Sequence, residues 1–335
     1  MGIRILKGGM MTTVQDLGRY GYQSQGFSVA GVMDVRSFKI ANLLLDNPEN
    51  EAVLEITLIG PTLEFTSATI IAITGGDFQP TINGEPAPMY TALYMNKGDV
   101  LKFWKRQNGK QRLYCFFQLS GYSGSDGKPM HQLKSGLGGF KGRKLEADDY
   151  IGFRIKRRYL PFFLSRKLDM DEFDQTEATL RVVMGPQDGM FSKQGIQTFL
   201  GSEYTVTNEF DRMGCRLEGP FIAPKKTSDI ISDGIAFGAI QVPSHGKPII
   251  LLADRQTTGG YGKIATVASV DIPKLVQRKT DDKIHFKAIT VQEAQALYVE
   301  EMKELDGLRK IIHQPCKEVL DCRLVAKRLR KLFEE

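Results

Sequence analysis

Two short apolar runs, at residues 235–242 and 248–253, constrain the fold of this chain more than any other feature. Each has the length of a buried strand, and the residues between them, 244–247, have turn chemistry. The second run leads directly into a dense polar set that is closed by Gly259-Gly260, a pair that lets the backbone approach a neighbour closely. This pattern is typical of the rim of a small-molecule pocket, or of a hydrogen-bonded structural turn.

Further β-branched runs predict strands along most of the chain. They occur at residues 53–58, 62–65, 69–73, 100–104, 113–119, 179–184, 204–206 and 284–286. Helical spacing of apolar residues appears at 35–45, where Asp34 is a good N-cap, and at 291–312. Pro315 ends the second helix, and a short basic helix is predicted after it. The chain is therefore expected to be mostly β, as a barrel or a sandwich.

Short matches in the same order suggest that the chain contains two related β units. Gly60-Pro61 is repeated as Gly219-Pro220, and residues 83–86 resemble 245–248. We predict a first β half at 1–165, a second at 166–290 that carries the polar set, and C-terminal helices at 291–335.

Composition is ordinary for a soluble globular protein. Hydrophobic residues make up 41% of the chain, and no apolar run approaches the ~20 residues of a membrane span. The N-terminus is too polar for a secretory signal, so a cytoplasmic protein without a membrane partner is expected. The net charge is +6, with basic runs at 154–158 and 327–331. Neither run belongs to a recognisable nucleic-acid module, so both are interpreted as solvated surface and no nucleic-acid partner is expected.

The cysteines and histidines do not form a pattern that binds metal. The four cysteines are scattered, without a Cys-x-x-Cys pair or a Cys/His cluster of zinc spacing. No metal site is predicted. Cys215 is the only cysteine near the suspected site, and it has no base in its motif.

Several motifs carry a specific resemblance. They are TTVQDLGR at 12–19, MD at 33–34, LEITLIGP at 54–61, GPQD at 185–188, residues 211–220, QVP at 241–243, HGKPI at 245–249 and ADRQTTGGY at 253–261. These motifs are similar to those of the allophanate hydrolase subunit 2 family, which includes the C subunits of 5-oxoprolinase (the KipA proteins) and the carboxyltransferase domain of urea amidolyase. The resemblance covers most of residues 10–300. The chain departs from it at 128–131, where a polar loop is expected, and in the basic tail after about residue 306.

The resemblance implies a fold of cyclophilin-like β-barrel units and a role in an assembly. Bacterial 5-oxoprolinase uses three proteins, its A, B and C subunits, to hydrolyse 5-oxoproline (pyroglutamate) to L-glutamate with ATP, and this chain resembles the C subunit. The expected partners are the A subunit of 5-oxoprolinase and its KipI-like B subunit. The lactam is resonance-stabilised, so its carbonyl must be activated before water attacks. The chain has no phosphate-loop motif, so ATP is expected to bind within the assembly and the chain to be inactive alone.

Two other functions remain open at this point. One is biotin-dependent carboxyl transfer to a urea-like or amide acceptor. The chain lacks an Ala/Val-Met-Lys-Met attachment sequence, so no covalent biotin is expected on it. The other is a non-catalytic role as a regulator that binds a KipI-like kinase inhibitor.

The candidate site is predicted around residues 254–261. The predicted catalytic residues are Asp34, Asp254 and Arg255, and the predicted substrate-binding residues are Asp16, Arg19, Arg212, Gln241, Gln256, Thr257, Thr258 and Tyr261. Arg255 or Arg212 would hold the substrate carboxylate through two hydrogen bonds. Gln241 and the threonine hydroxyls would orient the amide, and Asp254 or Asp34 would accept its N–H or position water. A structural alternative makes Asp254 and Arg255 an ion pair that closes the barrel, and Asp34 a helix cap alone.

Overall fold

The structure is a computed structural model that describes residues 1–104, 114–119, 131–132, 137–153, 159–170 and 176–315. The predicted second basic helix, the basic runs at 154–158 and 327–331, and residues 128–130 of the departing loop lie outside these ranges. In the described part of the chain, no helix has both the length and the apolar character that crossing a membrane requires.

The first half is built from two β-sheets. One has the strand order β13-β1-β4-β9-β6-β7, with bounds Tyr150–Gly152, Gly2–Lys7, Thr62–Phe65, Val100–Lys102, Thr81–Ile82 and Glu85–Pro86. The other has the order β2-β3-β10-β5-β8, with bounds Met11–Gln15, Val53–Thr57, Tyr114–Leu119, Thr69–Gly75 and Ala92–Met95. A small pair, β11 (His131–Gln132) and β12 (Leu137–Gly138), completes it.

Period-2 alternation explains why the first half packs as it does. In β4 every second side chain is buried, so Leu63 and Phe65 enter a core that also holds Ile3, Ile56 and Ile73 from both sheets. Helix α1 (Val35–Leu44) lies against β5 and β10, and Leu44 belongs to a second apolar cluster there. The short helix η1 (Gln23–Gln25) lies in the loop before α1.

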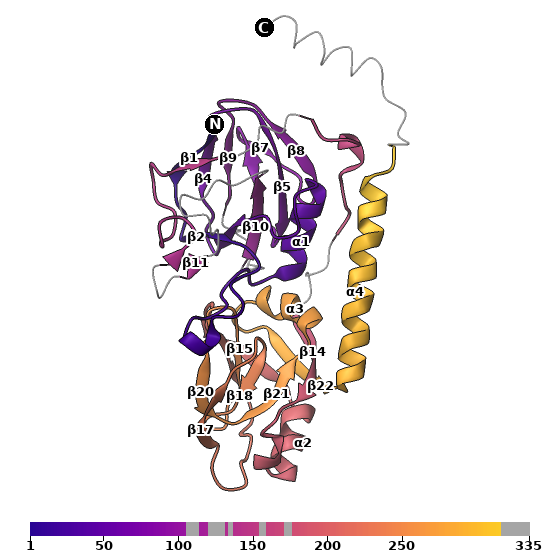
Figure 1. The fold of residues 1–335 in the computed structure, drawn as a ribbon. Coiled ribbons are helices and arrows are strands. Elements are labelled where there is room, and N and C mark those ends of the chain that lie inside the picture. The colour runs from indigo at the N-terminus through magenta and orange to yellow at the C-terminus, as the bar shows by residue number, and fades with distance from the viewer. Residues whose placement is uncertain (105–113, 120–130, 133–136, 154–158, 171–175, 316–335) are drawn as a thin grey trace, which may run out of the picture.

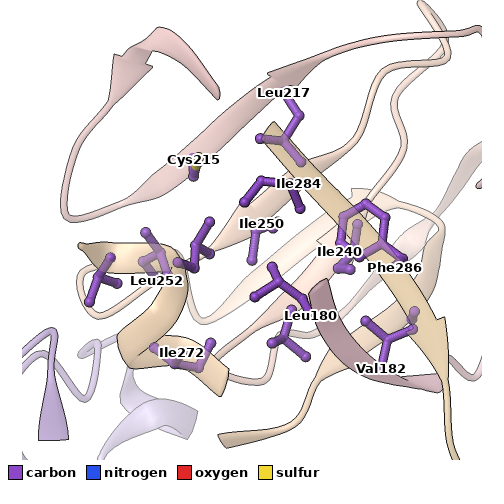
Figure 2. Close-up of a cluster of buried hydrophobic side chains, with 14 of the residues drawn as sticks. Leu180, Val182, Cys215, Leu217, Ile240, Ile250, Leu252, Ile272, Ile284 and Phe286 are labelled. Carbon is purple, nitrogen blue, oxygen red and sulfur yellow. The ribbon is translucent and has the colours of Figure 1, made fainter. Parts of the chain in front are cut away.

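The second half is a closed seven-stranded barrel. Its strand order is β14-β21-β18-β19-β16-β15-β22, with bounds Glu177–Met184, Lys263–Val267, Ala239–Gln241, Ile249–Leu251, Gly214–Glu218, Tyr204–Phe210 and Lys283–Ala288. The pair β14–β22 is parallel and the other pairs are antiparallel. Fully buried side chains from opposite walls, among them Leu180, Ile240, Ile250 and Ile284, fill the interior, as Figure 2 shows. The barrel is therefore a packed core and not a channel.

Shorter elements surround the barrel. The helices are η4 (Asp188–Met190), α2 (Lys193–Gly201), η5 (Ser269–Asp271) and α3 (Ile272–Val276). A further short helix, η3 (Phe163–Ser165), lies against the first half, where Phe163 packs on the apolar cluster that contains Leu44. The strands β17 (Asp229–Gly234) and β20 (Thr258–Tyr261) form a separate two-stranded sheet, which we call the ribbon.

Apolar contacts join the two halves. The barrel core cluster also contains Val32, Met33, Phe38 and Val53 from the first half. Helix α4 (Val291–Ile312) then runs along one side of both halves and contacts α1, β14 and η5 (Figure 1). The interface is thus a continuation of the core.

The predicted mostly β fold with a C-terminal helix is confirmed, and helix 291–312 is found with the predicted bounds. The prediction of one strand over 235–242 is wrong, because only Ala239–Gln241 is a strand. Gly238 has a positive φ of 81°, and its N–H bonds to the carbonyl of Leu251 in a turn. Residues up to Leu168 still pair with the first half, because Ala92 N–H donates to Arg166 O and Leu168 N–H to Tyr90 O.

Candidate functional site

A cavity of about 500 Å³ lies on the outer side of the barrel, between the β15–β16 hairpin and the ribbon. Gln241 and Ile249 are register partners on neighbouring strands and line the cavity, whereas the adjacent partners Ile240 and Ile250 are buried in the core. The other lining residues are Asn208, Glu209, Phe210, Asp211, Met213, Gly214, Arg216, Ile235, Leu251, Arg255, Gln256, Gly259, Gly260 and Tyr261. The cavity therefore has an apolar floor with polar groups around it, as small-molecule sites commonly do.

Arg255 is the buried cation of this cavity, with only 6% of its surface exposed. Its Nε donates to Ile235 O at 3.0 Å and its Nη1 to Leu252 O at 3.2 Å. Its guanidinium carbon lies 5.6 Å from the centre of the Phe237 ring. Among the described residues no carboxylate pairs with it and Nη2 has no acceptor, and burial lowers its pKa. The site thus holds a desolvated positive charge that an anionic ligand can neutralise.

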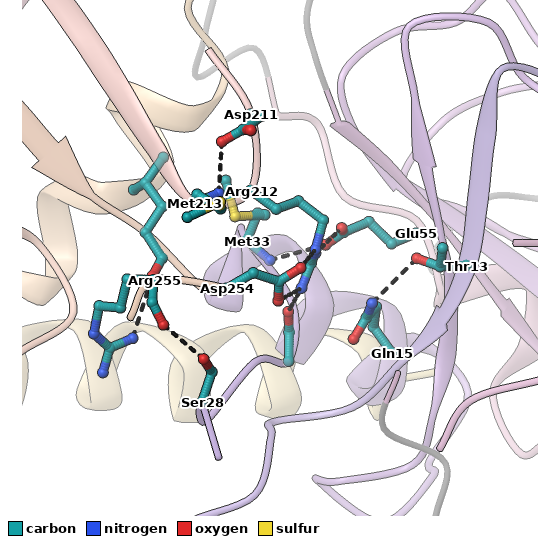
Figure 3. Close-up of polar contacts among 12 residues, drawn as sticks. Thr13, Gln15, Ser28, Met33, Glu55, Asp211, Arg212, Met213, Asp254 and Arg255 are labelled. Carbon is teal, nitrogen blue, oxygen red and sulfur yellow. Dashed lines mark hydrogen bonds and ion pairs between the residues drawn. The ribbon is translucent and has the colours of Figure 1, made fainter. Parts of the chain in front are cut away.

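Arg212 and Asp254 lie next to this cavity, in a buried network that joins the two halves (Figure 3). Arg212 Nε and Nη2 donate to the Asp254 carboxylate at 2.9 and 3.0 Å, and Nη2 also donates to Gly31 O at 2.6 Å. Nη1 pairs with Glu55, a residue of β3. Burial raises the pKa of Glu55, and the guanidinium opposes that rise. Asp254 therefore pairs with Arg212, not with Arg255 as the structural alternative proposed.

The network holds the backbone that carries Arg255. Asp254 N–H donates to Arg212 O at 2.7 Å, so the two residues are joined through main chain and side chain. From the first half, Ser28 Oγ donates to Arg255 O at 2.6 Å (Figure 3). Both sides of the interface thus fix the residue that enters the cavity.

Asp34, Asp16 and Arg19 do not line the cavity. Asp34 is fully buried and caps α1: its carboxylate accepts from Ser37 N–H at 2.9 Å, Ser37 Oγ at 2.7 Å and Gln277 Nε2 at 3.0 Å. Asp16 accepts from Gly18 N–H at 2.8 Å, and burial raises its pKa. The Arg19 guanidinium lies 5.7 Å from the centre of the Tyr22 ring.

The remaining predicted residues divide between the cavity and the ribbon. Gln241, Gln256 and Tyr261 line the cavity, and the side-chain amide of Gln241 contacts Tyr261 O at 3.5 Å. Thr257 and Thr258 are not among the lining residues; Thr257 O accepts from Ile235 N–H at 3.0 Å where the ribbon begins. The structure thus gathers Arg255, Gln241, Gln256 and Tyr261 around one space.

Several residues of this region were not predicted. The β15–β16 hairpin forms one wall, and Lys263 and Asp233 pair beside the ribbon at 2.8 Å. A lysine at the start of an otherwise apolar strand, residues 263–267, was the available signal for Lys263. Cys215 is fully buried and burial raises its thiol pKa, as expected of an inert core residue. In the described ranges, no three acidic, histidine or cysteine side chains converge as metal ligands.

The architecture is that of a carboxyltransferase domain. Residues 25–288 match the family described as "Carboxyltransferase domain, subdomain A and B". The fold is also that of the Kluyveromyces lactis urea carboxylase structure, with a TM-score of 0.82 at 24% identity over 94% of this chain and 30% of that one. The chain belongs to this carboxyltransferase family, as its sequence motifs indicated.

Relatives of similar length have a more specific name. The chain is 31% identical to the C subunit of the 5-oxoprolinase of Haemophilus influenzae over 305 residues, which cover 90% of this chain and 96% of that protein. It is also 31% identical to the C subunit of the Escherichia coli 5-oxoprolinase, over 93% of this chain and 99% of that protein.

A putative urea carboxylase of Emericella nidulans is 30% identical over 87% of this chain, which spans 24% of that much longer protein.

Proposed function

We propose that this chain is the C subunit of an ATP-dependent 5-oxoprolinase, in which it binds the substrate that the assembly hydrolyses to L-glutamate. Two relatives that it matches almost from end to end carry the name of this subunit. The observation that carries the chemical part of the proposal is Arg255, a buried cation without a carboxylate partner among the described residues, in the wall of a cavity of small-molecule size.

The cavity suits 5-oxoproline group by group. The substrate carboxylate would bind to the Arg255 guanidinium, which can grip two oxygens at once. The lactam amide would lie among the side chains of Gln241 and Gln256, and the apolar ring against Ile235 and Ile249. Tyr261 would close the rim. Thr257 and Thr258 do not line the cavity, and Thr257 would act by holding Ile235 through its carbonyl.

The remaining predicted residues act in this proposal by holding the site. Arg212 and Asp254 fix the loop before Arg255, and Asp34 fixes the start of α1. Asp16 and Arg19 belong to the loop on the first-half side. ATP, which activates the lactam carbonyl before water attacks, is bound by the assembly that this chain forms with the A subunit of 5-oxoprolinase and its KipI-like B subunit.

Reconstitution tests this proposal. The purified chain should release no glutamate from 5-oxoproline, and adding the A and B subunits with ATP should produce it. Arg255→Lys keeps the charge but loses the two-pronged grip, so we expect kcat/KM to fall by about 10²-fold with the fold intact. Robust turnover by the chain alone, or a fully active Arg255→Lys assembly, would contradict the proposal.

Arg216→Lys is the matched control. Arg216 lines the same cavity, but its guanidinium is half-exposed and already pairs with Glu209 at 2.9 Å. Because Arg216 is exposed to water and already paired with Glu209, it should contribute little to binding a ligand. Its replacement by lysine should therefore change kcat/KM less than about threefold. An equal loss in both variants would show that the loss is not specific to Arg255 and would contradict its role in binding the carboxylate.

Carboxyl transfer is the second candidate function, favoured by the match over residues 25–288 to a carboxyltransferase family. In that case a separate biotin carboxylase would supply carboxybiotin, and a urea-like or amide acceptor would fill the cavity. Incorporation of labelled bicarbonate into the acceptor, without release of glutamate, would favour this function. Binding of a KipI-like protein without either activity would favour the regulatory role.

A further inference from the structure

The ribbon forms one wall of the cavity and lies very close to the barrel. Ile235, which follows β17, and three residues of β20 line the cavity. A side chain at Gly259 would approach Gln241 Nε2 and Ile235 Cδ1 to 2.7 Å each, so only glycine fits there without displacing a neighbour. The width of the cavity therefore depends on where the ribbon rests.

A buried lysine fastens this ribbon to the barrel. Lys263 is 4% exposed and lies opposite Gln241 on the neighbouring strand, at a point where the register of the two strands shifts. Its Nζ donates to Asp233 Oδ2 in β17 at 2.8 Å. Asp233 in turn lies opposite Gly259 in the ribbon ladder. The ion pair thus connects the barrel directly to the strand pair that lines the cavity.

Gln187 supports the same pair from a third segment. Its Nε2 donates to Asp233 Oδ2 at 3.3 Å, and its Oε1 accepts from Lys263 N–H at 3.3 Å. The bond from Lys263 is the largest cause that holds the pKa of Asp233 below its usual value, and the bonds from Gly234 N–H and Gln187 act in the same direction. The carboxylate, which is also half-exposed to water, is therefore charged at neutral pH.

Packing alone does not require an amine at this position. An apolar side chain of similar volume stabilises a protein as well as a buried ion pair in many cases, because the pair must be taken out of water. The ion pair adds geometric specificity, because the hydrogen bond between Lys263 and Asp233 fixes the position of β17 relative to the barrel. The contribution of Lys263 is then to the geometry of the cavity.

We propose that Lys263 is a positioning residue of the candidate site: through Asp233 it holds the ribbon against the barrel and so sets the affinity for the bound ligand. This inference takes the identity of the ligand, a small carboxylate with an amide, from the proposed function. The position of the ribbon itself is independent of that function.

Three variants test it: Lys263→Met, Asp233→Asn and the double variant. In the reconstituted assembly, each should raise KM for 5-oxoproline about tenfold while kcat changes less than twofold. The double variant should be no worse than either single one, because the two residues act as a unit. Lys283→Met, which removes an ion pair with Glu203 on another part of the barrel (3.1 Å), is the control and should leave KM unchanged.

Hydrogen exchange of the purified chain gives a readout that needs no activity. The amides of Ile235, bonded to Thr257 O, and Gly262, bonded to Ser228 O, should exchange faster in all three variants and at the wild-type rate in Lys283→Met. Unchanged exchange with unchanged KM, or effects that add in the double variant, would overturn the inference. If the wild-type assembly released no glutamate but exchange changed as expected, the proposed function would fail and the ribbon role would stand.

Discussion

The interface between the two halves contains buried charged side chains, and removing one of them should strongly lower the stability of the protein. Arg212 pairs with both Asp254 and Glu55, and these three side chains are almost completely buried. Arg212→Met would leave two carboxylates buried without a cation, so we expect the free energy of unfolding to fall by about 3–5 kcal/mol. Urea titration measures it. Arg4→Met at the exposed pair with Asp148 (2.7 Å) is the control and should change stability by less than about 1 kcal/mol.

Asp271 should make the stability of the protein depend on pH in the acidic range. Burial acts to raise its pKa, but bonds from Arg181 and Lys274 outweigh it and the net pKa lies below 3.8. An acid with a depressed folded-state pKa stabilises the fold above its unfolded-state value, and that stabilisation is lost as the pH falls through the folded-state pKa. Asp271→Asn should therefore lose about 2–3 kcal/mol at pH 7 and show a smaller fall in Tm below pH ~3.8. A variant as stable as wild type at pH 7 would contradict this.

The sequence revealed some site residues and not others for a physical reason. Arg255, Gln256 and Tyr261 follow a buried strand in one motif, so local order alone placed them near a pocket. The partners of Arg212 come from β3 and a loop of the other half, and no local pattern encodes such contacts. Lys263 is buried where it pairs with Asp233 of the ribbon, and this contact depends on tertiary structure.

At the scale of elements, the open question at helix α1 is whether Asp34 acts only as its N-cap, and substitutions of Asp34 can answer it. Asparagine caps a helix about as well as aspartate, whereas alanine does not. If capping is its role, Asp34→Asn should keep most of the stability and of the assembly's activity, and Asp34→Ala should lose about 1–2 kcal/mol. Thermal unfolding and glutamate release measure these. A stable but inactive Asp34→Asn variant would assign a chemical role to the carboxylate.

Elements with a clear period or β-branched run were predictable, and some short elements without one were not. Helix α4 has both an amphipathic face and a capping box at Thr290 and Glu293, so its bounds could be found from the sequence. Helix α3 has five residues, too few to show a period, and it was missed. The apolar run 235–242 looked like one strand, because apolar residues stand on both sides of the turn at Gly238.

For the whole molecule, the two β halves could be predicted, but not how closely they are joined. The motif echoes indicated two units and gave no information on their interface. The structure places Met33, Phe38 and Val53 of the first half in the core cluster of the barrel. Helix α4 adds ion pairs from Glu301 and Glu304 to Arg36 of α1.

This shared core predicts that both halves unfold in one transition, because neither can open without exposing apolar surface of the other. Trp104, the single tryptophan, reports on the first half by fluorescence. Alkylation of the buried Cys215, quantified from its own peptide, reports on the barrel. The two midpoints in urea should coincide, and Arg212→Met should lower both together. Two separated midpoints, or a shift of only one of them in Arg212→Met, would show that the halves are independent units.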